Sequence, residues 1–114
     1  MHIPTGITPI LMATAALSHL NVVSSWRLVT YSDTACNSVP NGDVRGDANV
    51  GCTTTPSTTI GGFEGYELGN CQIAVFDGLA SCNGDDPLDV AAPGSNEGEC
   101  NGAYIGRYYS VSFC

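Results

Sequence analysis

Three segments of the chain combine aromatic and β-branched residues, as β-strands do, and the first two stop at turn-forming residues. They are Trp26–Tyr31 (WRLVTY), Gln72–Phe76 (QIAVF) and Tyr108–Phe113 (YYSVSF). In the last segment the alternation with Ser110 and Ser112 places Tyr109, Val111 and Phe113 on one face. The pattern therefore predicts three strands.

Weaker strand signals of the same kind lie at Ala48–Thr54, Gly62–Leu68 and Ala103–Gly106. No window sustains the 3.6-residue apolar period of an amphipathic helix, and turn-forming residues recur every few positions. Many short strands separated by turns predict an all-β fold, either a sandwich or a small barrel.

Two parts of the chain resemble one another. Leu28–Ser38 reads LVTYSDTACNS and Ile73–Gly84 reads IAVFDGLASCNG. Each is an apolar run that ends in an aromatic residue, followed within two positions by Asp, then by a short loop with Ala, and then by Cys-Asn and a small residue. This similarity favours two hairpin units that repeat about a pseudo-twofold axis.

A strand that runs into Tyr31-Ser32-Asp33 or Phe76-Asp77-Gly78, with a folded hairpin and small residues behind it, resembles the Greek-key unit of βγ-crystallin-like folds. These folds include secreted fungal and yeast killer-toxin-like proteins with several disulfides. The resemblance implies a small, disulfide-stapled Greek-key sandwich or barrel. The calcium motif of the family, two Asn/Asp residues followed two positions later by Ser/Thr-Ser, is not reproduced, because Asp89 stands where a hydroxyl should be.

Asp85, Asp86 and Asp89 form the densest carboxylate cluster of the chain. Oxygen ligands at such short spacing on a turn suit a hard cation such as calcium. The simpler interpretation is a solvated acidic turn that Pro87 helps to fix, since no glycine and bidentate glutamate complete a calcium loop. We expect no metal and no other cofactor.

From Met1 to Ser25 the chain has no Asp, Glu, Lys or Arg, and Ile7–Leu20 has the length of a signal-peptide hydrophobic region. This apolar run falls short of the ~20 residues that a membrane-spanning helix needs. We expect a signal peptide over residues 1–25 and a single secreted β domain over residues 26–114.

All six cysteines follow that boundary, and an even number in a short secreted chain predicts a framework of three disulfides formed in an oxidising compartment. If the two similar segments are equivalent, symmetry favours the pairs Cys36–Cys52 and Cys82–Cys100, which leaves Cys71–Cys114. A rival symmetric pairing is Cys36–Cys71, Cys82–Cys114 and Cys52–Cys100.

Three arginines face eleven carboxylates, there is no lysine, and the formal net charge is −8. Such a surface repels phosphate backbones and anionic lipid headgroups, so we expect no nucleic-acid partner and no membrane attachment. Both histidines, His2 and His19, lie in the expected signal peptide. Without histidine or lysine the secreted domain has no Ser-His-Asp or Cys-His catalytic unit and no His-ligated zinc, and we expect it not to be an enzyme.

Glu64, Glu67 and Asp77 are the candidate acid–base carboxylates near apolar segments. A glycoside hydrolase needs two carboxylates that face each other across a cleft. Nothing in the sequence sets that separation, so we interpret all three as surface carboxylates.

Three further features bear on recognition. Arg45-Gly46-Asp47 spells an integrin-binding tripeptide on an expected loop, although simple turn chemistry explains it as well. Thr53–Thr59 (TTTPSTT) fits O-glycosylation or a polar edge strand equally. Among the aromatic residues, we expect Tyr104 and Tyr108 at the surface, where they could contact a ligand, and we expect in the core Trp26, Tyr31, Phe76 and Phe113.

The signal peptide, the six cysteines and the acidic domain are similar to the small cysteine-rich secreted proteins of filamentous fungi, many of them considered effectors. The expected function is therefore that of a secreted, monomeric, non-enzymatic protein, effector- or toxin-like, that binds a protein or carbohydrate partner outside the cell. Two alternatives remain open: a small carbohydrate-active enzyme or enzyme inhibitor that relies on Asp and Glu alone, and a structural cell-wall protein.

Overall fold

The computed structural model describes residues 25–114, and the expected signal peptide lies outside the described residues apart from Ser25. Eight strands and one short helix follow the order β1 (Trp26–Tyr31), β2 (Gly42–Gly46), β3 (Val50–Thr54), β4 (Ile60–Tyr66), β5 (Gln72–Phe76), α2 (Leu79–Asn83), β6 (Asp89–Ala91), β7 (Asn101–Gly106) and β8 (Tyr108–Ser112).

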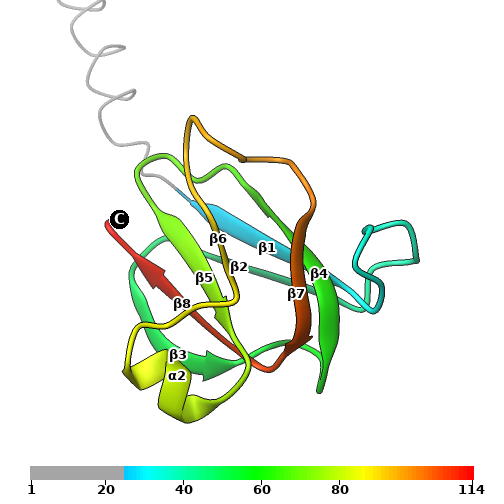
Figure 1. Cartoon of the computed structure of the whole chain (residues 1–114). Helices are drawn as coiled ribbons and strands as arrows, with labels where there is room; N and C mark the ends of the chain where they lie inside the picture. The colour runs from blue at the N-terminus through cyan, green and yellow to red at the C-terminus, as the bar shows by residue number, and fades with distance from the viewer. Residues whose placement is uncertain (1–24) are drawn as a thin grey trace, which may run out of the picture.

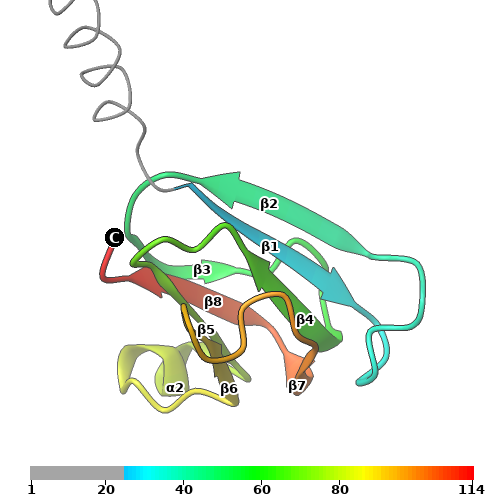
Figure 2. The ribbon, with the colours of Figure 1, turned by 90° about the horizontal axis from the view of Figure 1, so that it is seen from above.

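The strands form two four-stranded antiparallel sheets packed face to face (Figures 1 and 2). Sheet A has the strand order β2-β1-β4-β7, and sheet B has the order β3-β8-β5-β6. Helix α2 lies on the outer side of sheet B, as the view in Figure 2 makes clear. The prediction of an all-β, disulfide-stapled sandwich is confirmed, and the sheets do not close into a barrel.

The strand order is that of two equivalent units, β1–β4 and β5–β8. If β1–β4 are matched in order with β5–β8, the order β2-β1-β4-β7 of sheet A corresponds to β6-β5-β8-β3. This is the order of sheet B read from its other edge. Each unit places its third strand, β3 or β7, in the sheet of the other unit. The prediction of two repeated units is therefore confirmed at the level of strand order.

Alternation along the strands builds one core between the sheets. The indole N–H of Trp26 donates to the carbonyl oxygen of Ala48 (2.9 Å), and the ring of Trp26 meets that of Tyr109 edge to face with centroids 6.0 Å apart. The largest side chains that fill the remaining core are those of Leu28, Ile60, Phe63, Leu68, Ile73, Val75 and Val111.

The expected strands β1 and β5 have the predicted bounds, but β8 ends one residue early. Phe113 adopts a left-handed backbone conformation (φ 66°) and is 70% exposed, so the prediction of a core position is wrong. The chain turns there because Cys114 is bonded to Cys71 and its backbone N–H donates to the Asn49 side chain (2.9 Å). Trp26, Tyr31 and Phe76 are buried, as expected.

The three disulfides join Cys71 to Cys114, as predicted, and Cys36 to Cys100 and Cys52 to Cys82. The predicted pairs Cys36–Cys52 and Cys82–Cys100 are wrong, as is the whole rival pairing.

The exchange of third strands explains the correction. Cys52 lies on β3, which belongs to sheet B, and there it bonds to Cys82 of α2. Cys100 directly precedes β7, which belongs to sheet A, and it bonds to Cys36 of the β1–β2 loop. Equivalent cysteines thus form equivalent bonds, but between the units instead of within them.

Candidate binding site

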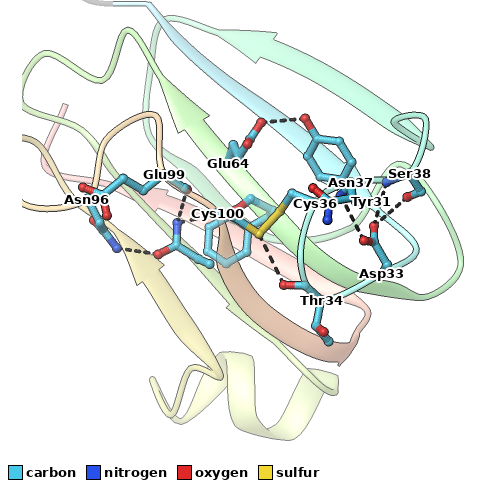
Figure 3. Close-up of a disulfide and its surroundings, with 12 residues drawn as sticks. Tyr31, Asp33, Thr34, Cys36, Asn37, Ser38, Glu64, Asn96, Glu99 and Cys100 are labelled. Atoms are coloured by element: carbon cyan, nitrogen blue, oxygen red, sulfur yellow. Dashed lines mark hydrogen bonds between the residues drawn. A yellow bond between two sulfur atoms is a disulfide. The ribbon is translucent and has the colours of Figure 1, made fainter.

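Glu64 of β4 accepts two tyrosine hydroxyls on the outer face of sheet A. The hydroxyls of Tyr31 and Tyr66 both donate to the same carboxylate oxygen, at 2.6 and 2.7 Å. Figure 3 shows the Tyr31–Glu64 contact next to the Cys36–Cys100 disulfide. The hydrogen bond to Glu64, with a further contribution from burial, raises the pKa of Tyr31 to about 12, and the same two causes raise the pKa of Tyr66.

An ion pair extends this arrangement toward the edge of sheet A. The guanidinium of Arg27 donates to both carboxylate oxygens of Asp43 (3.0 and 2.7 Å) and lies 5.8 Å from the ring centroid of Tyr66. The hydrogen bond from Arg27 lowers the pKa of the Asp43 carboxyl. A two-point arginine–carboxylate pair and a cation over an aromatic face order a surface; they supply no proton donor or nucleophile.

The Cys36–Cys100 bond fixes the β1–β2 loop over this face. Gly62 of β4 leaves space for it, because a side-chain Cβ at this position would lie 3.0 Å from the Cys36 sulfur. On the other side of the bond, Asn96 donates to the buried Asn101 side chain (2.6 Å), which donates in turn to the carbonyl oxygen of Glu99 (3.0 Å) (Figure 3). These contacts hold the β6–β7 loop against sheet A.

The structure places Asp77 apart from Glu64 and Glu67. Glu64 points out from sheet A, Glu67 lies beyond the end of β4, and Asp77 follows β5 in sheet B. The Asp77 carboxylate accepts the Ser81 hydroxyl (2.6 Å) at the start of α2. A glycosidase needs two carboxylates that face each other across a cleft, and none of these three residues lines either of the two pockets described below.

The acidic turn after α2 does not form a metal cage. Asp89 accepts the backbone N–H of its own neighbour Val90 (2.9 Å), and the backbone N–H of Asp86 donates to the carbonyl oxygen of Ser81 (2.9 Å). Asp85 adopts a left-handed conformation (φ 55°). Within residues 25–114, no three His, Cys, Asp or Glu side chains are placed to hold a metal ion.

The sequence predicts that the Arg45-Gly46-Asp47 tripeptide lies on a loop. This prediction is wrong for Arg45 and Gly46. Arg45 and Gly46 are the last residues of β2, paired with Arg27 and Trp26 of β1. Gly46 faces the core, where a Cβ would collide with the Trp26 ring. The tripeptide therefore spans the end of β2, with Arg45 and Gly46 in the strand and Asp47 directly after it.

Two features that the sequence singled out meet in a pocket of about 560 Å³ at one end of the sandwich. The hydroxyl-rich segment supplies one wall, and Tyr108, expected at the surface and half-buried in the structure, supplies part of the other. Tyr104 is exposed, as expected, but lies outside the pocket. The lining residues are Thr54, Thr55, Pro56, Ser57, Thr58, Thr59, Arg107 and Tyr108.

Backbone contacts tie the two walls of the pocket together. The N–H of Thr55 donates to the carbonyl oxygen of Arg107 (2.8 Å), and the Thr55 hydroxyl lies 3.2 Å from that same Arg107 oxygen. The N–H of Arg107 donates to the carbonyl oxygen of Phe76 in β5 (2.8 Å). Thr55 is buried, so its bond to Arg107 is shielded from water. The pocket is therefore built into the fold.

Sequence reasoning missed Arg107 as a site residue. Arg27–Asp43 is the one ion pair within residues 25–114, so the exposed Arg107 guanidinium has no carboxylate partner there. The sequence feature that could have identified Arg107 is the rarity of arginine and lysine, since the chain has only three of them beside eleven acidic residues. An unpaired cation next to an aromatic ring and several hydroxyls can contact an anionic or polar ligand.

A second, smaller hollow of about 350 Å³ lies on the outer face of sheet B. Gln72 and Ala74 of β5 and Ser110 and Ser112 of β8 form its floor, and the exposed Phe113 lies at its side. Its polar lining includes one acidic residue, Asp85, and no basic residue. It lacks the cation that distinguishes the end pocket.

No protein-family model matches this chain, and neither curated proteins nor solved structures yield a match. In the part of the chain that the structure describes, no helix has the length and apolar character needed to cross a membrane. The three disulfides indicate an oxidising environment.

Proposed function

We propose that this protein is a secreted, non-enzymatic binding protein that contacts a partner outside the cell through the pocket at the end of the sandwich. The observation that carries the proposal is the tie between Thr55 and Arg107, which fixes both walls of a pocket of ligand size. A rigid pocket binds with little loss of conformational entropy, because its walls are already ordered.

The separation of the carboxylates supports the non-enzymatic part of the proposal. Glu64 holds two tyrosine hydroxyls and Asp77 holds the start of α2, so each has a structural partner. Neither of them lines the end pocket. The proposal therefore assigns them to stability, not to acid–base chemistry.

An effector- or toxin-like role, and a fungal source, belong to the same proposal. Their support is the resemblance to βγ-crystallin-like folds and to small cysteine-rich fungal proteins. Two equivalent four-stranded units joined in one sandwich agree with that resemblance, and three disulfides suit a small domain that works outside the cell.

The test uses the purified, disulfide-intact protein and insoluble cell-wall polysaccharides. Co-sedimentation measures binding, and the release of reducing ends measures hydrolysis in the same samples. We expect saturable binding without release. Hydrolysis that Glu64→Gln or Asp77→Asn abolishes, in variants whose circular dichroism matches the parent protein, would replace this proposal with the carbohydrate-active enzyme.

A further inference from the structure

We propose that the end pocket binds an acidic saccharide, with the guanidinium of Arg107 contacting the sugar carboxylate and the hydroxyl-rich wall contacting the sugar hydroxyls. This inference rests on the proposed function, since it names the ligand class of the same pocket. Four observations carry it: the origin of the pocket, its rigidity, its charge and its hydrogen-bonding groups.

The pocket exists because the two equivalent units differ in one connection. Strands β3 and β4 are joined by the five residues 55–59, whereas the equivalent strands β7 and β8 are joined by Arg107 alone. The longer connection extends beside the shorter one, and the space between them is the pocket. A site formed by extra residues in one unit is a local addition to the symmetric framework.

The longer connection is anchored at both Thr55 and Pro56. The hydroxyl of Thr55 donates to the carbonyl oxygen of Ser57 (2.5 Å), and its N–H donates to that of Arg107 (2.8 Å). The ring of Pro56 packs so closely on Gly42 of β2 that a Cβ at Gly42 would collide with it. Since the backbone of Arg107 is bonded on both sides, its side chain projects from a fixed point.

Charge selects an anionic ligand of small size. Arg107 has no carboxylate within ion-pair distance in the described part of the chain, whereas Arg27 is already neutralised by Asp43. The net charge of −8 repels large polyanions such as nucleic acids. A short ligand with one carboxylate at the pocket gains a charge-assisted hydrogen bond and meets less of this repulsion.

The remaining groups favour a sugar among such anions. Besides Thr55, whose hydroxyl is bonded within the protein, four of the eight lining residues carry aliphatic hydroxyls, which donate and accept hydrogen bonds as sugar hydroxyls do. Tyr108 offers an aromatic surface for the apolar side of a sugar ring and a phenolic hydroxyl. The volume of about 560 Å³ lies within the range of small-ligand pockets.

The test compares digalacturonic acid with its dimethyl ester, which keeps the sugar but removes the negative charges. Calorimetric titration of the disulfide-intact protein at low ionic strength limits screening. We expect saturable binding of the acid and at least about tenfold weaker binding of the ester, since a charge-assisted bond is lost. Equal affinity for both, or no binding of the acid, would overturn the proposal.

Matched arginine variants locate the contact. Arg107→Gln should weaken binding of the acid at least about tenfold, and Arg107→Lys should retain more of it than Arg107→Gln does. Arg45→Gln is the control, because Arg45 is also exposed and unpaired among the described residues but lies on β2, outside the pocket. Equal losses in Arg107→Gln and Arg45→Gln would show nonspecific charge attraction and contradict the assignment.

The two proposals fail in different ways. If the protein binds cell-wall material without hydrolysis but neither digalacturonic acid nor its ester, the acidic-sugar inference is wrong and the binding function stands. If co-sedimentation is accompanied by hydrolysis that a carboxylate variant abolishes, the binding function itself is wrong.

Discussion

Asp33 fixes the turn after β1 through hydrogen bonds to its carboxylate. It accepts the hydroxyl of Ser38 (2.6 Å) and the backbone N–H groups of Asn37 (2.9 Å) and Ser38 (3.2 Å) (Figure 3). The Ser38 hydroxyl, followed by the Asn37 N–H, lowers the pKa of Asp33 from 3.8 to about 2. This carboxylate therefore stabilises the fold above pH 3.8, and the contribution is lost as the pH falls toward 2.

Asp33→Asn should lower the melting temperature at pH 6, because the amide cannot accept all these bonds as an anion does. The difference from the parent protein should shrink as the pH falls from about 4 to about 2, where the parent carboxyl becomes protonated. Thermal melts at several pH values measure it. Asp47→Asn, which removes the same charge outside this turn, is the control; a constant difference at all pH values would contradict the assignment.

The Tyr31 hydroxyl should produce the opposite pH dependence. Its pKa is raised to about 12, chiefly by the hydrogen bond to Glu64, so its contribution is complete below pH 10 and is lost as the pH rises through 12. Tyr31→Phe should cost about 1 kcal/mol of unfolding free energy at pH 7. In denaturant titrations this cost should fall above pH 10. Tyr104→Phe, exposed and without a side-chain hydrogen bond in the described structure, should cost nothing measurable.

At the level of elements, the strands with their own apolar pattern could be predicted, the weaker signals overlap β3, β4 and β7, and only β2, β6 and α2 had no signal. The bounds of β1 and β5 follow from their β-branched and aromatic residues. Strand β2 (GDVRG) has the composition of a turn and is a strand because it pairs with β1, where Arg27 and Asp43 bind each other. Strand β6 and α2 are too short to produce a periodic signal, and both depend on packing against β5.

Gly65 of β4 shows how closely the elements pack. A Cβ at this position would lie 2.9 Å from the Ala91 Cβ of β6 and 3.3 Å from the Leu68 side chain. Gly65→Ala should therefore destabilise the protein by about 1–3 kcal/mol, because the sheets must move apart. Denaturant unfolding measures the change.

Gly102→Ala is the matched control for this substitution. Gly102 lies in the neighbouring part of sheet A, and a Cβ there would meet no atom within 4 Å. We expect no loss of stability, because the added methyl group has space and the unfolded chain loses freedom. Equal losses in both variants would contradict the assignment of the Gly65 effect to core packing.

At the scale of the whole molecule, the chain is two equivalent units that exchange their third strands. The repeat of LVTYSDTACNS in IAVFDGLASCNG predicted the units, and the structure has each aromatic residue, Tyr31 and Phe76, buried at the end of the first strand of its unit. The exchange itself could not be predicted, because strand pairing depends on long-range contacts that a local pattern does not contain. For this reason the sequence symmetry predicts disulfides within the units, and this prediction is wrong for Cys36 and Cys82.

The same limit applies to the end pocket. The sequence shows its hydroxyl-rich segment and Tyr108 as separate features, and no local pattern indicates that the connection 55–59 lies beside Arg107. The sequence shows Glu64 as a candidate acid, whereas its two tyrosine partners follow from β1 and β4 being neighbours in sheet A. Sites made by several elements emerge only when the sheet order is known.

Disulfide mapping without reduction tests the exchange of third strands most directly. Cleavage after arginine and at acidic residues separates all six cysteines, since each interval between neighbouring cysteines contains a cleavage site; examples are Asp43, Glu64, Asp77, Glu97 and Arg107. Mass spectrometry of the linked peptides should find Cys36 joined to Cys100, Cys52 to Cys82 and Cys71 to Cys114. Peptides that join Cys36 to Cys52 or Cys82 to Cys100 would place the bonds within the units and contradict the exchange.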